Sequence, residues 1–170
     1  LPMSAVARGL APNKEWKQTV HGQDWLIGDT ANASIGQGYM LASPMQLAVM
    51  TARLATGRSI TPRLVKSING VEQPHESGES LGVNENNLRT LRRAMYAVSN
   101  DRRGTAYRSR IIADGLRMAG KTGTSQVRNI TAAERAAGVI RNEDLPWERR
   151  DHALFVCFAP FDNPKYAISV

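Results

Sequence analysis

Two stretches of the chain repeat apolar residues at helical spacing, and each follows a helix start. The first repeat is Leu47, Met50 and Leu54, and the second is Leu88, Leu91, Met95 and Val98. Each set lies on one face of a helix. Ser43 and Gln46 predict a capping box before the first helix, and Gly57 is a natural stop. The second helix opens at Asn84, carries arginines on its wet face and is expected to end near Asn100.

Apolar and alternating runs elsewhere predict strands. They cover residues 62–68, 118–127, 152–158 and 165–170. Asn69-Gly70 after the first run is a hairpin signal, and a proline-bounded turn joins the last two. Thr131 and Glu134 indicate a capping box on a short helix in the polar loop that follows. Strands that follow helices in this way predict an α+β fold, with helices against an antiparallel sheet.

The first 39 residues lack such a period. Prolines and glycines interrupt residues 1–24, where residues 14–17 are expected to form at most a short turn. Gly36 and Gly38 suggest a tight backbone path, but no third glycine completes a dinucleotide-binding fingerprint and no strand clearly precedes them. We therefore expect a tight backbone path here rather than a nucleotide loop.

The length and composition set the scale of the molecule. A chain of 170 residues with 42% hydrophobic content can bury one sizeable core and most simply forms a single domain. No stretch is long and apolar enough to span a membrane. The chain starts at Leu1 and stops at Val170, inside a predicted strand. We therefore expect residues 1–170 to be part of a domain that is incomplete at both ends.

The net charge of +7 is concentrated in one stretch. Residues 89–121 hold nine Lys and Arg against two acids, which accounts for the whole excess. A basic run of this kind can bind nucleic acid, but only Tyr96 and Tyr107 are interleaved with it as stacking groups. The run equally fits an anionic substrate or a solvated face, and we expect no nucleic-acid partner.

The residues able to bind a soft metal ion are scattered. They are His21, His75, His152 and Cys157. The last two are five apart on a predicted strand and so face opposite sides. A single cysteine cannot form an internal disulfide, and its apolar neighbours predict a buried small hydrophobe. We expect neither a metal nor another cofactor.

One predicted strand combines a cation, two hydroxyls and a glycine: Lys121-Thr122-Gly123-Thr124. In an extended chain Thr122 and Thr124 project to one face. With the Lys121 ammonium they form a receptor for a carboxylate, held by charge-assisted hydrogen bonds. Gly123 leaves space for a second backbone close to the strand, which suits a peptide laid along it with its terminal carboxylate captured. The alternative interpretation is that a lysine-threonine-glycine triplet is common in proteins and that Gly123 only marks a β-bulge.

A lysine-threonine-glycine triplet has two companions on one kind of scaffold, S-x-x-K with an acylated serine and S-x-N. No serine here has a lysine three residues later. Ser67-Ile68-Asn69 matches S-x-N, but it runs into the hairpin signal and is interpreted as coincidence. A Ser-His-Asp triad stays open. The carboxylate clamp is present and the nucleophile is not.

Several motifs occur in an order shared with one enzyme family. They are Ser34-Ile35-Gly36-Gln37-Gly38-Tyr39, Ser43-Pro44-Met45-Gln46-Leu47, Gly104-Thr105-Ala106, and Lys121 to Val127. In this order they resemble class B penicillin-binding proteins. Residues 13–17, 150–152 and 158–164 narrow the resemblance to the branch that serves rod elongation. It covers essentially the whole chain.

The resemblance implies a partial serine β-lactamase and transpeptidase-like fold, an antiparallel sheet flanked by helices. It implies a peptidoglycan D,D-transpeptidase that cross-links stem peptides through an acyl-enzyme and binds β-lactams. It also implies a longer parent protein at the periplasmic face of the bacterial inner membrane, anchored by an N-terminal segment, with rod-elongation membrane proteins as partners.

The resemblance also implies roles for single residues. Lys121 would support the serine of S-x-N, and Thr122 and Thr124 would bind the terminal carboxylate of D-Ala-D-Ala or of a β-lactam. The N–H of Thr124 would be one oxyanion donor. Gly123 completes this catalytic motif, and Gln126 would contact the substrate. The departures are the missing S-x-x-K and S-x-N, which the family carries upstream of the matching segment.

Two other function classes stay open. A non-catalytic penicillin-binding relative would keep the clamp as a peptide-binding or scaffold module, and an S-x-x-K in the sequence before Leu1 would decide for the enzyme. A basic nucleic-acid-binding domain rests only on the charge of residues 89–121, and salt-dependent binding at physiological ionic strength would revive it.

A sheet that lacks its first strands exposes unpaired backbone groups and apolar faces. We therefore predict that the 170-residue chain self-associates, exchanges strands, or retains the remaining N-terminal part of its domain after proteolysis. Analytical ultracentrifugation checks this expectation, and a pure, cooperatively folded monomer would contradict it.

Overall fold

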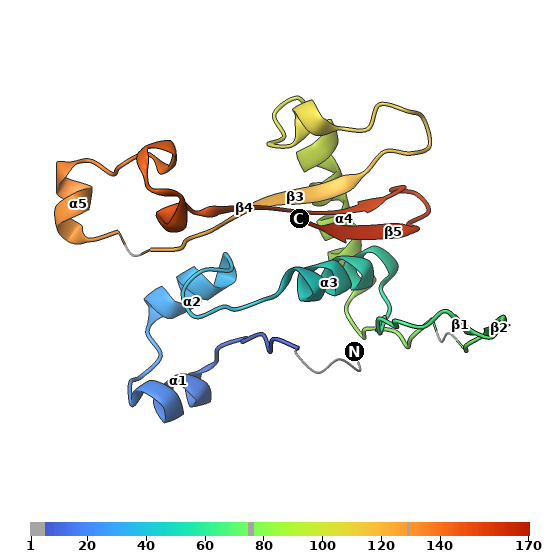
Figure 1. Cartoon of the computed structure of the whole chain (residues 1–170), viewed down its shortest axis with the longest axis horizontal. Helices are drawn as coiled ribbons and strands as arrows, with labels where there is room; N and C mark the ends of the chain where they lie inside the picture. Colours follow the sequence, from blue (N-terminus) through green and yellow to red (C-terminus); the bar gives the residue numbers. More distant parts are fainter. Residues whose placement is uncertain (1–5, 75–76, 129) are drawn as a thin grey trace. The chain divides into compact units, whose positions relative to one another are not determined.

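The computed structural model describes residues 6–74, 77–128 and 130–170 (Figure 1). The chain divides into two compact units. The first consists of Leu1–Gly9, Ala42–Thr122 and Phe155–Val170, and the second of Leu10–Leu41 and Gly123–Leu154. Strands β3 (Ala119–Ser125) and β4 (His152–Ala159) contribute residues to both.

The first unit contains both predicted amphipathic helices. Helix α3 (Pro44–Thr56) begins with the predicted capping box, in which the side chains of Ser43 and Gln46 each accept a hydrogen bond from the other's main-chain N–H. Gly57 ends it in the left-handed conformation, with a φ of 72°. Helix α4 (Glu85–Asn100) is capped by Asn84, as predicted.

A three-stranded sheet carries the order β3-β4-β5, so β3 lies at one edge. Strand β5 (Tyr166–Ser169) runs antiparallel to β4, with Phe158 opposite Ala167. Helix α3 packs against β5 and against α4. The predicted α+β class is confirmed, as are the strands of residues 118–127, 152–158 and 165–170, each with slightly shifted ends.

The core of the first unit draws on α3, α4 and the sheet. Ala55, Ala119 and Phe158 are buried, and the side chains of Met95, Tyr96 and Phe161 pack against them. The rings of Tyr96 and Phe161 lie 4.6 Å apart. Cys157 is buried, as predicted, and burial raises the pKa of its thiol.

The end of α4 positions the next segment of the chain. The Asn100 side-chain amide donates to the carbonyl of Met118 at 2.9 Å, which joins the helix to the start of β3. The chain then folds back, so that the Ala106 N–H donates to the Val98 carbonyl at 3.1 Å. Gly104 lies inside this turn, where an added Cβ would come within 2.2 Å of the Val98 oxygen. A short 3-10 helix follows at Tyr107–Ser109.

The hairpin of the first unit is shorter than predicted. Of residues 62–68, only β1 (Ser67–Ile68) is a strand, paired with β2 (Val71–Glu72). The turn is as predicted, with φ of 51° at Asn69 and 82° at Gly70, and both angles suit a primed hairpin turn. Both strands are exposed, so no buried face extends the pairing, and Pro62 cannot donate to a ladder.

The second unit holds the largest departures from the sequence prediction. Helix α1 (Lys14–His21) occupies a stretch expected to be irregular or at most a short turn, and helix α2 (Ile27–Ser34) forms where no helix was predicted. The local signal for α1 is Asn13, whose side chain accepts from the Trp16 N–H at 2.7 Å and caps the helix. No comparable signal precedes α2.

A buried ion pair stabilises α2. Lys17 is only 3% exposed, and its ammonium donates to the Asp29 carboxylate at 2.6 Å. The same carboxylate accepts from the Leu26 N–H at 2.7 Å, which caps the helix start. Because the pair joins residues twelve positions apart, the local pattern of α2 does not reveal it.

The rest of the second unit includes α5 (Ala132–Ala137) and two short 3-10 helices, Asn142–Asp144 and Trp147–Arg149. The predicted Thr131 cap is confirmed: its hydroxyl accepts from the Glu134 N–H at 3.1 Å. The Glu134 carboxylate does not complete a capping box, because it binds the Arg128 guanidinium through two hydrogen bonds of 2.7 Å.

We predict that Gly104→Ala destabilises the chain by about 1–3 kcal/mol, because the overlap with Val98 forces the backbone to move. Urea unfolding measures the change. Gly28→Ala is the matched control, since it lies in the first turn of α2 with nothing within 4 Å of the added Cβ. There we expect equal or greater stability. Equal unfolding free energies for the two variants would contradict the turn geometry.

Candidate functional site

The predicted carboxylate clamp lies on β3, the edge strand of the sheet. Lys121, Gly123 and Thr124 are exposed, and Thr122 is half-buried. The two threonines are two residues apart in one strand, and such residues project to the same face. Ammonium and hydroxyl donors on an accessible strand edge can bind a carboxylate through charge-assisted hydrogen bonds.

Within the sheet, the neighbouring strand approaches β3 closely at Gly120. A Cβ added to Gly120 would lie 2.4 Å from the Phe155 ring and 2.8 Å from the Val156 carbonyl oxygen. A Cβ added to Gly123 would meet Leu154 only at an ordinary distance of 3.5 Å. Gly120 therefore allows β3 to lie close to β4, and Gly123 leaves free space along the strand.

Thr122 has a hydroxyl partner within the first unit. Its Oγ1 lies 2.9 Å from the Oγ1 of Thr105, and either can donate. Thr105 is presented by the turn around Gly104, which only a residue without a Cβ can occupy. The Lys121 ammonium donates to the main-chain carbonyl of Thr122 at 2.7 Å. Sequence reasoning gave Thr105 no role, although its motif was part of the family resemblance.

Thr124 and Gln126 belong to the second unit. The Thr124 carbonyl accepts a hydrogen bond of 2.8 Å from the Gln37 side-chain amide, across 87 positions of sequence. Gln126 is exposed and lines a cavity of about 380 Å³ together with Gln37, Asn32 and Arg135. Sequence reasoning gave Gln37 no role, and its only local signal is the glycine on either side.

The other sequence candidates are not brought together. Ser67 lies in the exposed hairpin, which agrees with its interpretation as a coincidental match. Within the described ranges, no three His, Cys, Asp or Glu side chains are grouped to hold a metal ion. His75, one of the soft-ligand candidates, lies outside the described residues.

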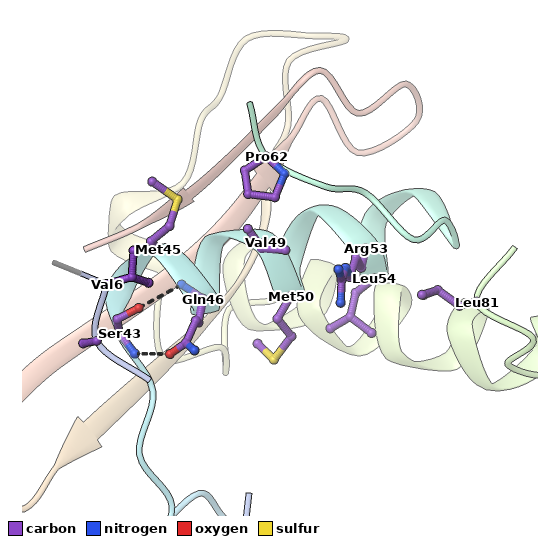
Figure 2. A pocket seen from close by; sticks show the side chains of 11 residues that line it. Val6, Ser43, Met45, Gln46, Val49, Met50, Arg53, Leu54, Pro62 and Leu81 are labelled. Atoms are coloured by element: carbon purple, nitrogen blue, oxygen red, sulfur yellow. Dashed lines mark hydrogen bonds between the residues drawn. The ribbon is translucent and has the colours of Figure 1, made fainter. Parts of the chain in front are cut away.

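An apolar groove of about 750 Å³ runs along α3 (Figure 2). Its lining includes Val49, Met50 and Leu54. The polar side chains at the groove are already bonded: Ser43 and Gln46 cap α3, and Arg53 donates to the Ile60 carbonyl at 3.0 Å. The groove offers apolar surface rather than reacting groups, so the candidate site remains the clamp on β3.

None of the helices in the described part of the chain has the length and hydropathy needed to cross a membrane.

Comparison with known proteins gives a consistent result. The family model of the penicillin binding protein transpeptidase domain matches residues 7–170. The peptidoglycan D,D-transpeptidase MrdA of Haemophilus influenzae is 37% identical over 165 residues, which are 94% of this chain and 25% of that protein. The chain thus spans about a quarter of the length of the curated relatives it matches.

Solved structures agree in fold. The Pseudomonas aeruginosa PBP2 structure in complex with WCK 5153 has 36% identity and a TM-score of 0.77, covering 99% of this chain and 34% of that one. Helicobacter pylori PBP2 in complex with MreC has 35% identity and a TM-score of 0.75, covering 98% and 27%. The predicted resemblance to the rod-elongation branch and to a partial transpeptidase fold is confirmed. The chain belongs to the penicillin-binding protein transpeptidase domain family.

Proposed function

We propose that the chain is the carboxylate-binding part of a peptidoglycan D,D-transpeptidase of the PBP2 branch. The observation that carries this proposal is the solvent-accessible motif Lys121-Thr122-Gly123-Thr124, with Thr122 half-buried, on an edge strand in a chain of this family. An edge strand can receive an extended peptide as one further strand. The proposed ligand is a stem peptide that ends in D-Ala-D-Ala, or a β-lactam in its place.

Each clamp residue has a separate part in the proposal. The hydroxyls of Thr122 and Thr124 donate to the terminal carboxylate, and the Lys121 ammonium adds positive potential and supports the serine of S-x-N. The Thr124 N–H is one oxyanion donor, and losing a single such donor typically costs ~10²–10³ in rate. Gly123 leaves room for the peptide backbone, and Gln126 contacts the substrate.

The reaction also needs a nucleophile. A serine oxygen attacks the carbonyl carbon of the penultimate D-alanine, the terminal D-alanine leaves, and an amine of a second stem peptide then takes the acyl group from the serine. No serine in this chain has a lysine three residues later. We infer that another part of the longer protein supplies the serine and its lysine, as well as the S-x-N element.

We infer further that the longer protein is anchored in the bacterial inner membrane and acts on its periplasmic face, with rod-elongation membrane proteins as partners. The complex of H. pylori PBP2 with MreC supports this kind of partner. A non-catalytic relative that binds peptide through the same clamp is the alternative, and an unreactive full-length protein would favour it.

In the longer protein, we predict that Lys121→Ala slows acylation by a labelled penicillin by ~10²-fold, because the site loses its cation. The Lys121 side chain is exposed, so the free energy of unfolding should change by no more than about 0.5 kcal/mol. Lys165→Ala, at another exposed lysine, is the control and should keep the wild-type rate. Unchanged acylation of the Lys121 variant would count against the clamp.

The 170 residues alone should not be acylated by penicillin, because they lack a serine with a neighbouring lysine and half of the oxyanion hole. Intact-mass measurement after incubation with a labelled penicillin tests this, with the longer protein as the reactive control. A stoichiometric adduct on any serine between Ser4 and Ser169 would show that the nucleophile lies within the chain.

A further inference from the structure

Gln37 contacts the clamp strand but has no part in the proposed function. Its side-chain amide donates to the main-chain carbonyl of Thr124 at 2.8 Å, and Gln37 itself is half-buried. Both residues belong to the second unit. The contact therefore joins a loop near the start of the chain to one of the two clamp threonines.

The loop around Gln37 is built to hold this amide in one direction. Gly36 and Gly38 have φ of 74° and 73°, a conformation that glycine adopts with little strain. The Gln37 N–H donates to the carbonyl of Asn32 at 2.9 Å. An added Cβ at Gly38 would come within 3.3 Å of the Asn32 Cβ. The loop is thus folded tightly against the last turn of α2.

Helix α2 is itself anchored. The buried Lys17 ammonium donates to Asp29, and this hydrogen bond and the one from the Leu26 N–H hold the pKa of that carboxyl below its usual value. At the base of the segment, Leu10 and Leu41 exchange two main-chain hydrogen bonds of 2.8 and 3.0 Å. Residues 10–41 therefore form a closed segment with an internal ion pair, which supports the Gln37 loop.

Thr124 is the last residue but one of β3 and is exposed. A hydrogen bond to its carbonyl restricts rotation of its main chain, and hence the directions of its hydroxyl and N–H. Resting on the function proposed above, we propose that Gln37 is a positioning residue of the transpeptidase site. Its amide N–H holds the Thr124 main chain in the orientation that binds the substrate carboxylate and the oxyanion.

In this proposal the N–H donor of the Gln37 side chain orients Thr124, and the shape of the side chain does not. Three variants of the full-length protein separate the two: Gln37→Lys keeps a donor, Gln37→Met keeps the length without one, and Gln37→Glu offers only acceptors. The readout is the second-order rate of acylation by a labelled penicillin. We expect the lysine variant to stay within about threefold of wild type, and the methionine and glutamate variants to be ~10–10²-fold slower.

Gln23→Glu is the matched control, because Gln23 is exposed in the same segment, and it should react at the wild-type rate. All four variants should keep a thermal midpoint within about 2 °C of wild type. Wild-type rates for the methionine and glutamate variants, or an equal loss in the lysine variant, would overturn the inference. Decreases in acylation rate that parallel decreases in thermal midpoint would also overturn the inference. An unreactive wild-type protein would instead overturn the proposed function.

Discussion

The contact of β3 with β4 at Gly120 is the constraint on which the clamp strand depends. Ala119 is fully buried in the core, and Gly120 lies so close to Phe155 and Val156 that no Cβ fits there. One end of β3 is thereby held in the core, whereas Lys121, Gly123 and Thr124 are exposed at the sheet edge and Thr122 is half-buried. Because one end of the strand is buried in the core, the other end can present polar side chains to solvent with no other element packed over it.

Each clamp threonine is further held by a residue from a distant segment, and both segments depend on glycine. The Gly104 turn brings the Thr105 hydroxyl to Thr122. The paired glycines around Gln37 bring its amide to Thr124. A Cβ at Gly104 would clash with the backbone, and the positive φ of Gly36 and Gly38 would strain a residue with a side chain. The glycines outside the lysine-threonine-glycine motif therefore shape the two segments that contact the threonines of the proposed clamp.

The sequence predicted what is encoded locally. Caps and an apolar period within one stretch sufficed for α3 and α4. The residue types of Lys121 to Thr124 are the basis of the proposed clamp. Helix α2 was missed because the Lys17–Asp29 pair that stabilises it joins residues on two helices. The strand of residues 62–68 was predicted too long, since Leu64 and Val65 are apolar yet exposed. The contacts of Thr105 and Gln37 arise only in the folded chain.

The central claim is that Thr122 and Thr124 bind the carboxylate of a substrate or a β-lactam. A crystal structure of the full-length protein after reaction with penicillin tests this most directly. We predict that the penicillin carboxylate lies within hydrogen-bond distance of both threonine hydroxyls, at about 2.5–3.0 Å. A carboxylate bound by other residues, with both hydroxyls more than about 4 Å away, would contradict the claim.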